Sequence, residues 1–378
     1  MSNLTFDQLH SLLMSVFRLD HSDTGWLAIL IDLPDARRRD NDLWKDRRAI
    51  AAEWFKELSP HAHELPFSAI VFCAYPNVGS NNNDLPESMV VAEGLPEFDL
   101  LPRGKTLSTT GILRSSSVLL SLTEFSATAP LKLLAKDYSY RGATMPGFQR
   151  KMLPTLLLDY EAVHNRVVMF KERMDRASGF RVSLEANGKV FESFFDLRFR
   201  TGHASGGLIR EKQQVGNLPS GEAYIVPYEG ERTNTRSLTE GILPVQFGEE
   251  VVLYKIRENR AFEVVSDGEQ SDLERGKLAE EPAYGNIAEV GIGVLGEWGV
   301  TAVGSTLLDE KLGLHIAFGR SDHFGGTVGP SSFKNKDNVI HIDRVYVKSM
   351  QPVISVANAS LVFGGEEEQI IAEDKYLI

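Results

Sequence analysis

The sequence is poor in the features that define several large protein classes. Cys73 is the one cysteine among 378 residues, which excludes an internal disulfide framework and a cysteine-rich metal site. No uninterrupted apolar run reaches about 18 residues, the length that a membrane-spanning helix needs. The N-terminus lacks a basic segment followed by an apolar one, so no secretory signal is indicated. These absences predict a cytoplasmic protein without a membrane partner.

Positive charge is also scarce. The chain has 40 Lys and Arg against 52 Asp and Glu, a net charge of −12, which argues against nucleic acid as a partner. No G-x-G-x-x-G segment follows an apolar run, so a dinucleotide site would lack its phosphate-binding loop. With 42% hydrophobic residues, the length of the chain allows two domains, each with its own core.

Residues 1–176 alternate continuous apolar runs with helical patterns. Such runs are typical of strands that are buried on both faces of a parallel sheet. We therefore predict an α/β fold whose first domain, residues 1–176, is a doubly wound α/β domain. Asp32 ends the first apolar run, and we interpret it as capping a loop rather than as a site residue. The predicted strands are 25–32, 67–74 and 118–122, and the predicted helices are 4–18, 42–58 and 149–176.

From residue 177 onward the pattern changes to alternation. Asn187-Gly188 separates two alternating segments, 180–186 and 189–196, and is a strong signal for a β-hairpin. We predict a β-rich (α+β, barrel-like) domain over residues 177–378. Its further strands are predicted at 223–227, 243–247, 251–256, 261–265, 314–318, 339–347 and 352–356, and its helices at 272–281 and 297–308.

Metal-ligand residue types gather in this second half. His341 and Asp343 flank one apolar residue in a predicted strand, so their side chains point to the same face. An imidazole beside a carboxylate suits Zn²⁺, Mn²⁺, Co²⁺ or Fe²⁺. Glu222 follows a turn that Pro219 and Gly221 make rigid, which fixes the direction of its carboxylate. Taken alone, this segment favours Glu222 as a residue of a surface turn, and the other motifs change that interpretation.

Five short motifs follow one another in a fixed order, and together they carry a family resemblance. The chain resembles the metallo-aminopeptidases typified by aminopeptidase T and aminopeptidase S. The resemblance covers the C-terminal half, whereas the N-terminal half matches in its α/β pattern and in 141–147. The motifs are N-L-P-S-G-E at 217–222, E-V-G-I-G at 289–293, E-K at 310–311, H-I-A-F-G at 315–319 and H-I-D at 341–343.

This resemblance implies a catalytic second domain with two divalent metal ions, Zn²⁺, Co²⁺ or Mn²⁺. A hydroxide that bridges the two ions would attack the first peptide bond of a peptide or related small substrate. Glu222 or Glu289 would also serve as general base, and Asp343 would bridge the metals. The resemblance further implies a homodimer. The implied metal ligands are Glu222, Glu289, His315, His341 and Asp343.

One implied ligand is missing. The family has a tyrosine seven residues after the histidine that corresponds to His315, and this chain has Asp322 there, followed by His323. The family's threonine before that histidine is also absent, since Leu314 stands in its place. Imidazole and carboxylate both bind metals at neutral pH. We expect His323 to take the vacant position, with Asp322 as the alternative. A third possibility is that both residues face solvent and that water fills the position.

Two other readings remain open. A related fold carries 2,5-dihydroxypyridine dioxygenase chemistry, in which two histidines and one aspartate hold a single Fe²⁺. In those enzymes a histidine stands where this chain has Glu289, and the position of His315 is not a ligand. Because this chain has Glu222, Glu289 and His315, the sequence favours two metals over one. The third reading is a relative without catalytic activity that uses the cleft for binding.

Overall fold

A computed structural model describes residues 3–93, 103–335 and 338–378. The chain divides into two compact units that are interleaved along the sequence. The expected boundary between two domains at residue 176 stays a prediction, because a compact unit of a structure is not necessarily a domain that folds independently. Unit 1 consists of Met1–His164, Gly207–Ser220 and Val303–Leu308, and unit 2 of Asn165–Gly206, Gly221–Ala302 and Asp309–Ile378.

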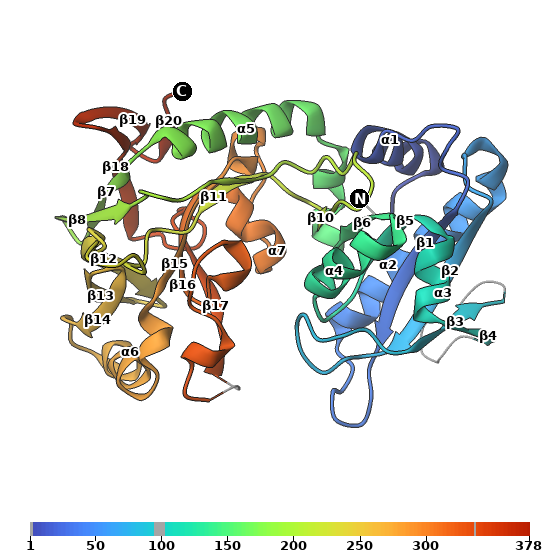
Figure 1. The fold of residues 1–378 in the computed structure, drawn as a ribbon, viewed down its shortest axis with the longest axis horizontal. Helices are drawn as coiled ribbons and strands as arrows, with labels where there is room; N and C mark the ends of the chain where they lie inside the picture. Colours follow the sequence, from blue (N-terminus) through green and yellow to red (C-terminus); the bar gives the residue numbers. More distant parts are fainter. Residues whose placement is uncertain (1–2, 94–102, 336–337) are drawn as a thin grey trace. The chain divides into compact units, whose positions relative to one another are not determined.

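Unit 1 contains a seven-stranded sheet in the order β10-β6-β5-β1-β2-β3-β4 (Figure 1). β1 lies in its interior and pairs in parallel with β2 and β5, while β3 and β4 run antiparallel. Apolar runs buried on both faces form the parallel strands, so the expected α/β class is confirmed. The strands are β1 Trp26–Leu33, β2 Ala69–Pro76, β3 Ser88–Ala92, β4 Gly104–Ser108, β5 Ser116–Ser121, β6 Arg141–Thr144 and β10 Val215–Asn217.

The helices of unit 1 begin at recognisable caps. Thr5 and Gln8 form a capping box at the start of α1, and the Asn41 side chain accepts a hydrogen bond from Trp44 N at the start of α2. Asp32 is buried at the end of β1 and accepts hydrogen bonds from the backbone N–H groups of residues 124 and 125, as a loop cap does. The helices are α1 Phe6–Phe17, α2 Asp42–Leu58, α3 Thr109–Ser115 and α4 Thr128–Tyr138, with 3₁₀ turns at Ser59–Glu64 and Arg150–Leu157.

Two predicted helices differ from the structure. The expected helix 149–176 is a 3₁₀ helix, Arg150–Leu157, followed by α5, Tyr160–Arg176. Asp159 separates them, since its side chain accepts hydrogen bonds from the first N–H groups of α5. The expected helix 297–308 is wrong: after a 3₁₀ turn at Leu295–Trp298 the chain becomes irregular, and only α7, Thr306–Asp309, is α-helical. Glycines with positive φ at 299 and 304 interrupt the helical pattern there.

Unit 2 contains two antiparallel sheets, as the alternating pattern predicts. The eight-stranded sheet has the order β14-β13-β12-β8-β7-β18-β19-β20, and the five-stranded sheet has the order β17-β16-β15-β11-β9. The predicted hairpin at Asn187 is present as β7 and β8. The strands of the larger sheet are β7 Gly179–Ala186, β8 Lys189–Asp196, β12 Glu240–Phe247, β13 Glu250–Arg257, β14 Arg260–Val264, β18 Ile354–Phe363, β19 Glu366–Ala372 and β20 Lys375–Tyr376.

The five-stranded sheet carries the chemistry discussed below. Its strands are β9 His203–Ser205, β11 Glu222–Ile225, β15 Ile287–Gly293, β16 Leu314–Gly319 and β17 His341–Val345. The predicted helix at 272–281 is α6, Glu269–Glu280, and short 3₁₀ turns lie at Pro282–Gly285, Glu310–Leu312, Asp322–Phe324 and Pro330–Ser332. Within the described residues, every helix is too short or too polar to cross a membrane.

Candidate metal centre

One face of the five-stranded sheet collects the predicted ligands. In an antiparallel pair, directly opposed residues point to the same face, as do residues two apart on one strand. Glu222 opposes Gly293, which is four residues from Glu289 on β15. His315 opposes Gly291 on that same strand. In β16, Ala317 opposes Asp343 and Gly319 opposes His341. All five predicted ligands project from this face: Glu222, Glu289, His315, His341 and Asp343.

Two further positions on this face, Gly291 and Gly293, are glycines that leave room for their neighbours. A Cβ atom at Gly291 would lie 1.9 Å from Nε2 of His315, so only glycine leaves room for the imidazole there. A Cβ at Gly293 would lie 2.2 Å from the backbone of Lys311. On β15 and β16 the opposite face is apolar and buried, for example at Val290 and Ile316. The alternation of β15 and β16 thus places polar groups in one layer and core residues in the other.

Three of the five residues form a buried cluster that could hold a metal ion. Ligand atoms of Glu222, Glu289 and His315 all lie within 4.8 Å of one another. Nε2 of His315 is 3.2 Å from Oε1 of Glu289 and 3.5 Å from Oε2 of Glu222. Two carboxylates and one imidazole are ligands that Zn²⁺, Mn²⁺ and Fe²⁺ accept.

His341 and Asp343 adjoin this cluster through Glu289. Nε2 of His341 is 3.5 Å from Oε2 of Glu289 and 3.6 Å from Oδ1 of Asp343. Glu289 therefore lies between the two histidines and presents one carboxylate oxygen to each. The short His341-x-Asp343 spacing does place the imidazole beside the carboxylate, as the strand geometry predicts.

One buried oxygen atom without a hydrogen-bond donor bears on whether these residues suit a cation. Among the residues that the structure describes, none donates a hydrogen bond to the buried Oε2 of Glu222. A buried carboxylate oxygen without a donor costs free energy. A divalent cation next to His315 would remove that cost. The donor set and this oxygen therefore fit a metal ion.

Lys311 is a buried cation in the same layer, and sequence reasoning assigned it no role. Its Nζ lies 2.7 Å from Oε1 of Glu222 and also pairs with Glu310. Although burial alone would lower it, the charges of Glu222 and Glu310 raise the pKa of Lys311. Burial also raises the pKa of the Glu310 carboxyl group well above its ordinary value. The signal in the sequence was the Glu310-Lys311 motif, whose charges give no hint that both side chains are buried.

The two histidines present the same ring nitrogen to the carboxylates. Nδ1 of His315 lies 3.1 Å from the carbonyl oxygen of Gly313, and Nδ1 of His341 lies 2.8 Å from that of Arg320. Because a carbonyl only accepts, Nδ1–H is the donor in each case and Nε2 faces the acids. This arrangement is common in metal-binding histidines.

Neighbouring acids also shift the titration of these groups. Burial alone would lower the pKa of His315, but hydrogen bonding to Glu289 and the nearby carboxylates raise it to about 9. For His341, burial is likewise outweighed by Asp343 and Glu289, and its pKa is raised well above the ordinary value. Burial would raise the pKa of Asp343, but His341 lowers it. The nearby carboxylates therefore favour the protonated form of both imidazoles.

His323 and Asp322 lie at the edge of this group, and neither belongs to the buried cluster of three. The His323 ring is 5.4 Å from the His341 ring, centroid to centroid, and 3.8 Å from the Phe324 ring, to which it is tilted by 40°. Burial, followed by the charge of His341, lowers the pKa of His323 to about 4. Asp322 accepts a hydrogen bond of 2.5 Å from Nε of Arg320. His323 as a metal ligand stays a prediction.

Comparison with known proteins places this site in a known fold. No protein-family model matches the sequence, and no curated protein matches it. The structure of 2,5-dihydroxypyridine dioxygenase from Pseudomonas putida KT2440 aligns with a TM-score of 0.59 and 13% identity over 99% of this chain and 98% of that one. Wild-type AmpT from Thermus thermophilus aligns with a TM-score of 0.56 and 13% identity over 98% of this chain and 99% of that one. The chain shares the fold of both proteins. The fold that the resemblance to aminopeptidase T implies is thereby confirmed, whereas the reaction has to be argued from the site.

Gly291→Ala should disable metal binding without touching a ligand. Its methyl group would occupy the place of the His315 imidazole, which is completely buried and has no free space to enter. We expect a loss in metal affinity on the order of 10–100-fold, as for other changes that misorient a ligand. Metal titration measures it. Gly276→Ala is the matched control, since nothing lies within 4 Å of a Cβ there. Equal metal affinity in both variants would contradict the assigned role of Gly291.

Proposed function

We propose that this protein is a metal-dependent aminopeptidase, a hydrolase that removes N-terminal residues from peptides at a two-metal site. The observation that carries the proposal is the sheet face on which three acids and two histidines converge around an unsatisfied oxygen of Glu222. The shared fold with AmpT from Thermus thermophilus supports it. The family resemblance, which five motifs in order carry, supports peptide hydrolysis as the reaction.

Glu222, Glu289, His315, His341 and Asp343 would hold two divalent ions, Zn²⁺, Co²⁺ or Mn²⁺. Once bound, such ions lower the pKa of a water molecule and polarise the carbonyl of the scissile peptide bond. The carbonyl oxygens of Gly313 and Arg320 fix the two imidazoles with Nε2 turned toward the acids.

The remaining residues set the charge of the site. Once bound metal has displaced the protons of His315 and His341, three buried or nearly buried carboxylates, those of Glu222, Glu289 and Asp343, would face one ammonium group, that of Lys311. This excess of acid favours cations and the positively charged amino terminus of a peptide over anionic substrates. Glu222 or Glu289 would accept the proton of the attacking water. An acidic site of this kind suits an exopeptidase that recognises a free amino terminus.

Metal analysis and peptide turnover test the proposal together. Protein purified without chelator should hold two divalent ions per chain and release the first residue of short peptides. A chelator should abolish turnover, and Zn²⁺, Co²⁺ or Mn²⁺ should restore it. A peptide with an acetylated amino terminus is the matched control substrate and should not be cleaved.

One specific observation supports a second candidate, an Fe²⁺ dioxygenase. The fold is shared with 2,5-dihydroxypyridine dioxygenase, and two histidines with one carboxylate can form the facial triad of such enzymes. One iron per chain, with oxygen consumption in the presence of 2,5-dihydroxypyridine, would favour this reaction. Protein that holds no metal and cleaves no peptide would instead favour a binding role.

We also propose that the chain forms a homodimer, as the family resemblance implies. Sedimentation equilibrium should then give twice the mass of one chain, and the mass of a single chain would contradict the proposal.

A further inference from the structure

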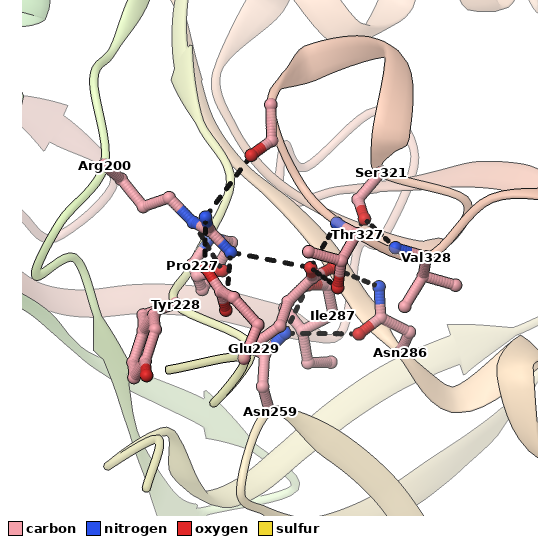
Figure 2. Close-up of polar contacts among 12 residues, drawn as sticks. Arg200, Pro227, Tyr228, Glu229, Asn259, Asn286, Ile287, Ser321, Thr327 and Val328 are labelled. Atoms are coloured by element: carbon pink, nitrogen blue, oxygen red, sulfur yellow. Dashed lines mark hydrogen bonds and ion pairs between the residues drawn. The ribbon is translucent and has the colours of Figure 1, made fainter. Parts of the chain in front are cut away.

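The side chain of Glu229 collects hydrogen bonds from several segments of unit 2 (Figure 2). Its carboxylate is 4% exposed. Oε1 accepts hydrogen bonds from Nδ2 of Asn286, at 3.0 Å, and from Oγ of Ser321. Oε2 accepts from the backbone N–H and from Oγ1 of Thr327, the latter at 2.7 Å, and lies 3.5 Å from Nη2 of Arg200. Every partner is a donor, so the site requires a group that only accepts.

Two of these donors, Ser321 and Thr327, belong to the loop 320–328, the first part of the connection from β16 to β17. The loop is also closed on itself, because Val328 N donates to Oγ of Ser321 at 3.3 Å and Ser321 N donates to the carbonyl oxygen of Val328 at 2.9 Å. Nη1 of Arg200 donates to the carbonyl oxygen of Gly325 at 3.3 Å, which holds the middle part of the loop. Glu229 therefore accepts hydrogen bonds from residues near both ends of a compact loop.

This loop meets the metal-ligand face through its first residue. The carbonyl oxygen of Arg320 accepts the Nδ1–H of His341 at 2.8 Å, and Arg320 N donates to the carbonyl oxygen of Ile340 at 2.7 Å. Asn286, which donates to Glu229, also donates to the carbonyl oxygen of Gly319. The backbone on both sides of Arg320 is thus held by groups that Glu229 binds.

We propose that Glu229 is a positioning residue for His341. It fixes the loop 320–328 so that the carbonyl oxygen of Arg320 holds Nδ1–H of His341, and this hydrogen bond turns Nε2 toward Glu289 and Asp343. Glu229 itself touches neither a ligand nor a substrate. The part of this inference that concerns metal binding rests on the proposed function, whereas the hold of Glu229 on the loop does not.

Glu229→Gln tests the inference at constant volume. The amide group of Gln would oppose at least one pair of donors, either those of Ser321 and Asn286 or those of Thr327. In metal-free protein, hydrogen exchange across 320–328 should accelerate. The dissociation constant for Zn²⁺, measured by competition with a chelator, should rise by roughly 10–100-fold, the usual effect of a change behind a ligand. Thr327→Val removes one donor only and should shift both quantities in the same direction, which keeps the test open if Glu229→Gln does not fold.

Glu250→Gln is the matched control. Glu250 accepts hydrogen bonds from Gln270 N, Ser271 N and Ser271 Oγ at the start of α6, so it resembles Glu229 in its partners. Its substitution should accelerate exchange near 268–272 and leave Zn²⁺ affinity unchanged. A loss of affinity equal to that of Glu229→Gln would overturn the inference, because any loosened loop would then suffice.

A double-mutant cycle with His341→Ala separates positioning from general destabilisation. If Glu229 acts through His341, Glu229→Gln should weaken Zn²⁺ binding in the wild-type background and have no further effect in the His341→Ala background. Additive losses would overturn the inference, as would unchanged exchange across 320–328 in Glu229→Gln. Wild-type protein that binds no Zn²⁺, Co²⁺ or Mn²⁺ would overturn the proposed function and the metal part of this inference, while hydrogen exchange would still decide whether Glu229 holds the loop.

Discussion

Glu289→Ala should remove bound metal and peptidase activity together. Glu289 lies between the two histidines, with one carboxylate oxygen 3.2 Å from Nε2 of His315 and the other 3.5 Å from Nε2 of His341. Its loss deprives both halves of the site of a shared ligand. Changes behind a ligand cost about 10–100-fold in affinity, so removal of a ligand should cost roughly 100-fold or more. Elemental analysis of the purified variant and single-turnover peptide cleavage measure the two effects.

A surface variant provides the control for this experiment. Glu249 is an exposed glutamate in the same unit, and Glu249→Ala should retain metal and turnover. Thermal denaturation should show that Glu289→Ala is folded. A folded Glu289→Ala protein with unchanged metal content and unchanged turnover would rule out the role assigned to Glu289.

Lys311→Met should destabilise the metal-free protein strongly. Lys311 is 1% exposed and pairs with Glu222 and Glu310. In the variant, both buried carboxyl groups would lack this counter-ion. Removing one partner of a buried ion pair costs about 3–5 kcal/mol of unfolding free energy. Saturating Zn²⁺ or Mn²⁺ should restore part of this loss, because a ligand that binds only the folded state stabilises it. Urea unfolding with chelator and with metal measures both quantities.

Lys171→Met is the corresponding surface control. Lys171 pairs with Asp175 on α5, and both side chains are about one-third exposed or less, at 30% and 27%. Helix pairs of this spacing contribute about 0.3–0.5 kcal/mol. Equal destabilisation by the two substitutions would show that Lys311 carries no special electrostatic role.

The sequence predicts local structure where one signal dominates. The Asn187-Gly188 turn defines the β7–β8 hairpin, and the apolar run ending at Asp32 defines β1. The helix predicted over 149–176 fails because its apolar spacing continues across Asp159, whose capping side chain starts a new helix. The helix predicted over 297–308 fails because two glycines there adopt positive φ. In both cases a local backbone preference overrides a periodic pattern.

The site is partly predictable for a different reason. His341 and Asp343 are two residues apart on one strand, so their proximity follows from strand geometry alone. The position of Glu222 opposite Gly293 depends on the pairing of β11 with β15, which are more than 60 residues apart in the sequence. Tertiary packing sets the register between strands that are so far apart in the sequence. The order of the motifs therefore predicts this pairing only through the family resemblance. Lys311 was matched only as part of the Glu310-Lys311 motif and received no role, because its partner Glu222 is distant in sequence. Glu229 was not singled out for the same reason, and the charge of each residue suggests exposure.

The small residues on the metal-ligand face also bear on how this protein's variants should be judged. A natural or engineered variant that retains all five proposed ligand residues should still lose the site if Gly291 or Gly293 acquires a side chain, because the added methyl group would displace His315 or the backbone at Lys311. A survey that scores only the ligands would classify such a variant as functional. The glycines opposite the ligands therefore belong in any signature used to recognise active members among distant sequences of this fold.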